Sequence, residues 1–263
     1  MGHGVVQDYG KAMRWYKRAA DGGSATAMDV IGQLYDHGSG VTANAAEAVV
    51  WYRRSAKAGN ADAMVRLGLL YSGGHGVERD KSKAIHWYRA AAEVGNAVGM
   101  YSLGLAYARG TGVGQDYRKA MQWYRKSAAK GYRNAMNNIG ALYVNGRGVR
   151  RDYRQAIRWY RKAAAKGSSM GMYNIGWLEL KGEGVKKNAS KALAWFKKAG
   201  RAGSAGAMEV VGKLYAKGVG TARDPKKAIL WFQKAVKAGD NHARIYIRAL
   251  RKVHKASPTA QRQ

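Results

Sequence analysis

The chain has 263 residues, of which 46% are hydrophobic, so it has the composition of a protein that folds around a sizeable core. It contains no cysteine, which excludes disulfides, thiolate metal sites and a cysteine nucleophile, and no apolar run approaches the length of about 18 residues that a membrane span needs. The formal net charge of +31 predicts attraction to polyanions but says little about the fold.

The sequence repeats itself every 36 residues. Columns of methionine, glycine and alanine, represented by Met28, Gly32 and Ala48, keep this interval along the chain. A fourth column holds every tryptophan except Trp177: Trp15, Trp51, Trp87, Trp123, Trp159, Trp195 and Trp231. Four columns in one register do not arise by chance, so the sequence indicates a tandem repeat protein.

Residues 2–24 correspond to the second half of a unit, because Gly2 to Val5 align with Gly38 to Val41. A helix around Trp15 that lacks its partner exposes apolar surface. We therefore expect that an upstream segment, with any targeting signal, was lost or not included. A naturally short form and a dimer contact through this end are the alternatives.

Six full units follow in residues 25–240, and each is predicted to contain two helices. In the first unit, Met28, Ile31 and Tyr35 lie on one face of a first helix. Ala48 and Trp51 begin the same pattern for a second helix. Since one pair cannot bury its apolar face alone, the units are expected to stack into a solenoid.

Polar and glycine residues mark the ends of these helices. Side-chain oxygens can cap the second helices at Asp8, Asn44, Asp80, Asp116, Asp152, Asn188 and Asp224. The first helices have possible caps at Ser24, Asn60, Asn96, Ser168, Ser204 and Asp240, but not at Tyr132. Glycines suited to positive φ end the second helices: Gly23, Gly59, Gly95, Gly131, Gly167, Gly203 and Gly239.

Residues 61–96 read ADAMVRLGLLYSGGHGVERDKSKAIHWYRAAAEVGN. This unit resembles the Sel-one-like repeat (SLR) family, which is related to the tetratricopeptide repeats, and the resemblance covers residues 2–240. It implies an all-α fold, a right-handed α-α superhelix of helix-turn-helix repeats. It also implies a scaffold or adaptor for proteins, commonly bacterial, with no enzymatic activity and no cofactor.

Two later segments depart from the pattern. Residues 241–254 keep the register of a first helix but carry arginine at the packing positions, as expected of a solvated capping helix, and 255–263 are expected to form a flexible tail. The unit 169–204 has Glu179 in the tyrosine column and adds Trp177. Either Glu179 turns towards solvent or a basic neighbour while the unit repacks locally, or Trp177 is an aromatic anchor for a ligand.

Several motifs that look chemical are interpreted as structural. Gly110 and Gly112 resemble part of a phosphate loop but recur in every unit without its GK[ST] ending, so they are predicted to form turns between helices. Ser127 and Lys130 match an S-x-x-K motif, yet Ser127 lies in a column of small residues. The histidines show no ligand spacing, so no metal site is expected.

The concave face of the solenoid is predicted to be the binding face. In the related tetratricopeptide fold, first-helix side chains that are not used for packing line this face. Amide and aromatic side chains on such positions suit an extended peptide. The predicted peptide-binding residues are Arg66, Tyr101, Ser102, Arg109, Asn134, Asn137, Asn138, Asn145, Tyr173, Asn174, Trp177 and Lys181.

Positive charge is concentrated in the second half of the chain. Residues 1–117 hold 13 basic and 10 acidic side chains, whereas residues 118–263 hold 34 and 6, a net of +28. The predicted polyanion-binding residues are Arg147, Arg150, Arg151, Arg154, Arg158, Arg161 and Lys162. A solvated face without a ligand explains such a run equally well.

The main hypothesis is therefore a non-enzymatic scaffold that binds a protein or peptide, preferably an acidic one. The alternative is a protein that binds nucleic acid or an anionic surface through its basic side chains, and a hydrolase is a distant third. We expect a monomer, unless the exposed N-terminal helix forms a dimer contact. The chain as it stands has no signal peptide, which favours the cytoplasm and leaves the periplasm or secretion open.

Overall fold

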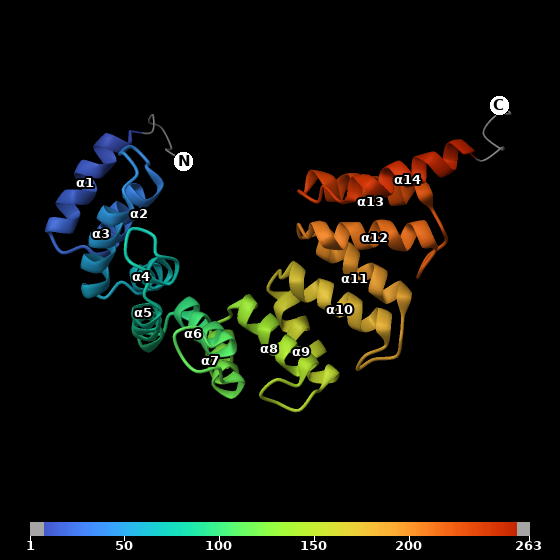
Figure 1. The fold of residues 1–263 in the computed structure, drawn as a ribbon, viewed down its shortest axis with the longest axis horizontal. Coiled ribbons are helices and arrows are strands. Elements are labelled where there is room, and N and C mark those ends of the chain that lie inside the picture. Colours follow the sequence, from blue (N-terminus) through green and yellow to red (C-terminus); the bar gives the residue numbers. More distant parts are fainter. Residues whose placement is uncertain (1–7, 257–263) are drawn as a thin grey trace. The chain divides into compact units, whose positions relative to one another are not determined.

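A computed structural model describes the backbone of residues 8–256 and the side chains of residues 8–252. This part of the chain contains 14 helices and no strand (Figure 1), so the predicted all-α repeat fold is confirmed. The helices are α1 (Tyr9–Asp21), α2 (Ala25–His37), α3 (Ala45–Lys57), α4 (Ala61–Gly73), α5 (Lys81–Glu93), α6 (Ala97–Arg109), α7 (Tyr117–Ala129), α8 (Arg133–Asn145), α9 (Tyr153–Ala165), α10 (Ser169–Lys181), α11 (Ala189–Arg201), α12 (Ala205–Lys217), α13 (Pro225–Lys237) and α14 (Ala243–Ala256).

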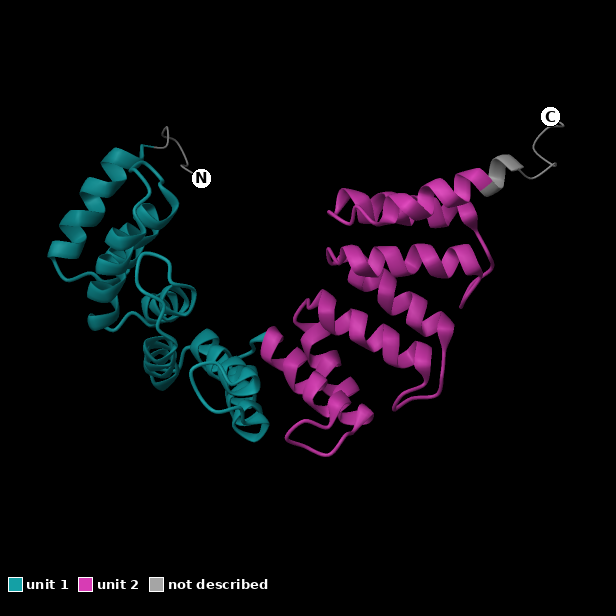
Figure 2. Ribbon diagram, in the orientation of Figure 1, with its two compact units in different colours: residues 1–132 teal, residues 133–263 magenta. Residues whose placement is uncertain are grey.

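The helices fall into two compact units, Met1–Tyr132 with α1 to α7 and Arg133–Gln263 with α8 to α14 (Figure 2). We refer to these two halves as unit 1 and unit 2, and to the 36-residue segments as repeats. None of the helices in the described part of the chain has the length and apolar character needed to cross a membrane. The segment Gly2 to Val5 and most of the expected tail, 257–263, lie outside the described residues, while α14 continues through Ala256.

Each first helix packs most extensively against the second helix that follows it, as α4 does against α5. The glycine column makes this possible, because the aromatic ring 20 residues later lies on the glycine itself. A Cβ atom at Gly32 would be 2.6 Å from ring carbons of Tyr52, and Gly212 has the same relation to Phe232. The glycine thus admits an aromatic ring of the same helix pair.

The ends of the helices follow the predicted chemistry. All seven expected caps of the second helices accept backbone N–H groups, as Asp80 does from Lys83 at 2.9 Å. The expected caps of α2, α4, α6, α10 and α12 do the same. The glycines that end the second helices have φ between 76° and 97°, in the left-handed region that glycine tolerates.

The G-x-G segments are turns between helices, as predicted. The second glycines of five of these segments lie against the start of the preceding second helix: Gly40, Gly76, Gly112, Gly184 and Gly220. A Cβ atom at Gly112, for example, would be 2.7 Å from the carbonyl oxygen of Lys81. Because neighbouring backbone fills the space beside Gly112, this turn holds no cradle for a phosphate group.

Cations stack on the tryptophan column, an arrangement that the sequence pattern alone does not indicate. In most repeats the basic residue three positions after the tryptophan lies over its indole ring. Arg54 is 4.2 Å from the ring centre of Trp51, and Lys162 is 4.4 Å from that of Trp159. Lys126, Lys198 and Lys234 repeat the arrangement. Part of the positive charge therefore contributes to packing.

Glu179 is 4% exposed, so of the two orientations expected for its side chain, towards solvent or towards a basic neighbour, the first is wrong. It occupies the position at which other units place a tyrosine beside cations. The ring of Tyr71, for example, lies below the ammonium group of Lys83. In the repeat register the positions around Glu179 that correspond to these cations hold Arg161 and Lys191. At this position a carboxylate therefore replaces the phenol of the other repeats.

Candidate peptide-binding site

Unit 1 contains a hollow of about 190 Å³ between the first helices α4 and α6, with α5 as its floor. Two of the predicted peptide-binding residues, Ser102 and Arg109, line it. The complete lining is Leu69, Ser72, Lys81, Ala84, Ile85, Tyr88, Ser102, Leu105, Ala106, Arg109 and Thr111. Both residues were predicted to lie on the binding face, whereas the hollow itself also depends on residues of α4 and α5.

The hollow combines an apolar interior with a basic rim. Leu69 is 57% exposed, which leaves its side chain available to a ligand. Burial raises the pKa of Tyr88 to about 12, although a hydrogen bond with the Ser72 side chain opposes the shift. Lys81 and Arg109 are both exposed at the edge. None of the lining residues carries a carboxylate.

Two other predicted binding residues in unit 1 are engaged within the protein. The Nε of Arg66 donates to Oδ1 of Asp29 at 3.2 Å, and its guanidinium lies 5.8 Å from the ring centre of Tyr52. Tyr101 packs its ring against that of Tyr132, with 5.0 Å between the ring centres. Both side chains are half-buried, so they support the packing of successive repeats as well as facing the surface.

In unit 2, the assignment of Asn137 to the binding face is wrong. Asn137 is 3% exposed, and its Nδ2 donates to Oγ of Ser168 at 2.7 Å, while its Oδ1 has no hydrogen-bond partner. It is buried because its helix position points to the cap of the next first helix. Asn138 and Asn174, one position further along their helices, are half-buried and remain on the surface.

The remaining predicted peptide-binding residues of unit 2 fall into two groups. Asn134, Asn145 and Lys181 are exposed. Tyr173 and Trp177 belong to an aromatic cluster in which the Trp177 ring meets Phe196 edge-on, with 5.4 Å between ring centres. The structure therefore gives Trp177 a packing role, which agrees with local repacking of this unit.

Three members of the column that contains Asn137 join successive repeats, a role that the repeat register alone did not indicate. These three side chains reach the residue 31 positions later, immediately before the next first helix. Tyr101 meets Tyr132 and Asn137 meets Ser168 in this way, while Glu209 approaches Asp240. The shared offset of 31 residues could have indicated these contacts from the sequence. It does so only once it is known that this position of a first helix points to the cap of the next first helix.

All seven predicted polyanion-binding residues are exposed, and three of them, Arg150, Arg151 and Arg154, line a second hollow of about 720 Å³. This hollow lies at the start of α9 and also includes Tyr143, Val149, Asp152, Tyr153, Gln155 and Gly184. Arg147, Arg158, Arg161 and Lys162 are not part of it. Lys162 covers the Trp159 ring, so its position is already explained by packing.

Ser127 has a structural role. It is fully buried, and its Oγ donates to the carbonyl oxygen of Ala97 at 2.7 Å. Ser55 occupies the equivalent position in an earlier repeat, and its Oγ donates to the carbonyl oxygen of Ala25 in the same way. The hydroxyl that an S-x-x-K nucleophile would use is therefore committed to holding the second helix to the first helix beside it.

Comparison with known proteins identifies the repeat. The Sel1 repeat family model matches residues 1–24, 25–60, 61–96, 97–132, 133–168, 169–204 and 205–240. A protective antigen of uropathogenic Escherichia coli that displays an SLR fold is 34% identical, with a TM-score of 0.81. The match covers 95% of this chain and 53% of the antigen, so this chain spans about half the length of that relative.

A Sel1 repeat protein from Oxalobacter formigenes is 37% identical, with a TM-score of 0.77, and the match covers 82% of this chain and 89% of that one. An immunity protein from Pseudomonas aeruginosa, 19% identical with a TM-score of 0.54 over 89% of this chain and 84% of its own, shares the fold alone. No protein with a curated description matches. Because seven consecutive matches coincide with the 36-residue register of the helix pairs, this chain belongs to the Sel1 repeat family, whose members generally mediate protein–protein interactions and are typically non-enzymatic.

Proposed function

We propose that this chain is an interaction scaffold that binds an extended segment of a partner protein in the hollow between α4 and α6. The bound segment places an apolar side chain against Leu69 and Leu105, and acidic side chains beside Lys81 and Arg109. The observation that carries the proposal is the combination of an apolar interior with two cations and no lining carboxylate.

The energetics favour such a ligand. Full burial of one leucine-sized side chain contributes about 1.5–3 kcal/mol, which gives the hollow a dominant anchor. Charged groups on the rim raise the association rate and the selectivity of binding more than they raise its affinity. Residues 1–132 carry 18 basic and 10 acidic side chains, so the field around unit 1 also favours an acidic partner.

A peptide panel tests the proposal. Extended peptides with one central leucine, flanked either by aspartate and glutamate or by lysine, would be titrated into the full-length chain by fluorescence anisotropy. We expect the acidic peptides to bind and Arg109→Glu to weaken them at least about tenfold, a loss of about 1.4 kcal/mol. Lys17→Glu makes the same charge change on the exposed side of α1 and should leave the affinity unchanged.

A second variant separates the hollow from the general charge of unit 1. Ser102→Phe places a ring in the hollow without changing charge, and we expect it to block the peptides that Arg109→Glu weakens. Circular dichroism would establish that the helices remain intact. If the acidic peptides bind Ser102→Phe as well as the unchanged chain, the binding site lies elsewhere and the assignment fails.

The arginines around the hollow at the start of α9 favour a second candidate function, attraction of a polyanion through its phosphate or sulfate groups. Heparin binding would be measured at low and moderate salt for the unchanged chain and for a double variant, Arg150→Glu with Arg154→Glu. A steep loss of affinity with salt, and a further loss in the double variant, would support this candidate. Salt-independent binding would exclude it.

A further inference from the structure

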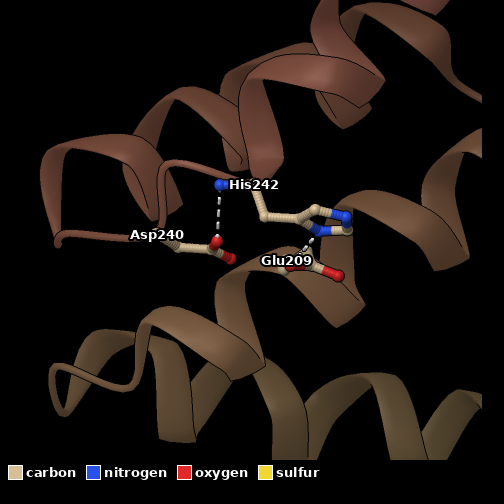
Figure 3. Close-up of side chains that lie close together, drawn as sticks. All are labelled: Glu209, Asp240 and His242. Atoms are coloured by element: carbon tan, nitrogen blue, oxygen red, sulfur yellow. Dashed lines mark hydrogen bonds and ion pairs between the residues drawn. The ribbon is translucent and has the colours of Figure 1, made fainter.

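Three potential metal ligands meet at the C-terminal end of unit 2. Glu209 lies on α12, whereas Asp240 and His242 lie in the turn between α13 and α14, and Figure 3 shows the three side chains directed towards one another. One ligand atom from each residue lies within 4.8 Å of the other two. Nδ1 of His242 is 3.5 Å from Oε2 of Glu209. Asp240 also accepts the backbone N–H of His242 at 3.1 Å, which holds the turn.

The two carboxylates are close enough to influence each other's ionisation. Burial, followed by the hydrogen bond with Glu209 and the charge of that group, raises the pKa of Asp240. Burial opposes the ionisation of Glu209, but hydrogen bonds from Lys213, Asp240 and His242 hold its pKa below the usual value. The carboxyl groups of Asp240 and Glu209 are therefore in direct contact at this end of unit 2.

This combination occurs at one place among residues 8–252: no other group of three or more carboxylate and imidazole side chains there comes this close together. The repeat explains why. The positions equivalent to Glu209 hold Asp29, Val65, Tyr101, Asn137 and Tyr173, and those equivalent to His242 hold Asp62, Val98, Asn134, Met170 and Gly206. Carboxylate or imidazole side chains therefore stand at all three positions, those of Glu209, Asp240 and His242, only at the end of the last repeat.

We propose that Glu209, Asp240 and His242 bind a divalent first-row transition-metal ion of the zinc type. Two carboxylate oxygens and one imidazole nitrogen form a donor set that Zn²⁺ accepts, at ligand distances of about 2.0–2.2 Å. The ligands must close by a small movement, which the exposed His242 side chain permits, since 59% of it is accessible. The fourth position opens to solvent and takes a water molecule. The ion ties the turn before α14 to α12.

Lys213 is the competitor of the metal ion. Its ammonium group forms an ion pair with Glu209 on the same helix and lies 4.6 Å from the ring centre of Tyr246. A metal ion must displace this ammonium from the carboxylate or share the carboxylate with it. Replacement of Lys213 by an uncharged residue therefore abolishes the ion pair with Glu209 but strengthens metal binding, and a purely structural cluster does not predict this gain.

Isothermal titration calorimetry with ZnCl₂ near neutral pH tests the proposal on the full-length chain without an affinity tag. We expect one ion per chain, and at least tenfold weaker binding in His242→Ala and in Glu209→Gln. Asp240→Asn keeps an oxygen for the N–H of His242 while removing the charge, and should also bind zinc more weakly. The melting temperature should rise with zinc in the unchanged chain and rise less in each variant.

Two further variants make the outcome unambiguous. His75→Ala is the matched control, because Nε2 of His75 also faces a carboxylate, that of Asp36 at 3.4 Å, without a third ligand. Its zinc affinity should equal that of the unchanged chain, and Lys213→Met should bind zinc more tightly. The proposal is overturned if zinc produces no binding heat, if His242→Ala binds as well as the unchanged chain, or if Lys213→Met binds no more tightly.

Discussion

The ring of Tyr52 packs directly on the backbone of Gly32, and a Cβ atom at that glycine would lie 2.6 Å from ring carbons. The same relation joins Gly212 on α12 to Phe232 on α13, and Gly176 to Phe196. The glycine column is thus explained by its aromatic partner 20 residues later. It needs no unusual backbone angle at these helical positions, since the glycines of positive φ all lie at turns and helix ends.

Gly212→Ala should destabilise unit 2. The added methyl group meets the Phe232 ring at a distance that ordinary contacts do not reach, so the ring must move, at a cost of about 1–3 kcal/mol. Gly206→Ala on the same helix is the control, because nothing lies within 4 Å of its Cβ position. That variant should be neutral or gain up to about 1 kcal/mol from helix propensity. Urea unfolding followed by circular dichroism measures both, and equal free energies of unfolding would contradict the packing argument.

Asn137→Ala should reduce stability. The change removes the buried hydrogen bond to Ser168 and leaves that hydroxyl with one partner fewer, a loss of about 1–3 kcal/mol. Asn138→Ala on the same helix makes the identical chemical change at a half-buried position and should stay within about 0.5 kcal/mol. Thermal unfolding of the two variants gives the comparison. Similar melting temperatures would show that the Asn137 side chain is not a structural link.

Lys162→Met should lower the free energy of unfolding by about 0.5–1 kcal/mol, because it removes the cation from the Trp159 ring while keeping an apolar side chain of similar length. Arg158→Met removes the same charge from an exposed position on the same helix and should have little effect. Lys162→Arg should restore the stability of the unchanged chain. Chemical unfolding monitored by tryptophan fluorescence measures all three, and a loss in Arg158→Met as large as that in Lys162→Met would indicate a general effect of charge.

Stability should fall in acid through the caps of the second helices. The backbone N–H of Lys83 lowers the pKa of Asp80, and that of Lys227 lowers the pKa of Asp224. A carboxylate whose pKa is lower in the folded state stabilises the fold at pH values above its unfolded pKa. This contribution disappears as the pH falls through the folded pKa.

The double variant Asp80→Asn with Asp224→Asn keeps both caps, since Asn44 already caps α3 with its amide oxygen. Its melting temperature should therefore decline less between mildly acidic and strongly acidic pH than that of the unchanged chain. Parallel pH profiles for the two proteins would mean that these caps do not contribute to the acid response.

The repeat register predicts the helices and their ends because each boundary depends on local chemistry. Asp224 followed by Pro225 specifies the start of α13, and the structure begins the helix there. Spacing alone could not place Asn137, because burial of one polar side chain depends on where the next helix begins. It also could not predict that Lys162 lies over Trp159, since a lysine has many rotamers and only the folded neighbourhood selects one.

The candidate sites were predicted only in part for the same reason. Ser102 and Arg109 were identified from their register, but the hollow that they line also requires residues of α4 and α5. Glu209 and His242 are 33 residues apart and belong to columns that hold no ligand residues in most units. Their meeting is a property of the stacked helices, and no spacing rule for metal ligands describes it.

The G-x-G turn that rests on the start of the preceding second helix recurs at a fixed interval, as does the ring on its glycine. Within unit 1 and within unit 2, successive helix pairs therefore meet through the same joint. A gene that gains or loses a multiple of 36 codons preserves every joint that remains, whereas any other insertion within a helix moves all later side chains to new faces. Such an array can change its length by whole units during evolution while its individual binding hollows diverge independently.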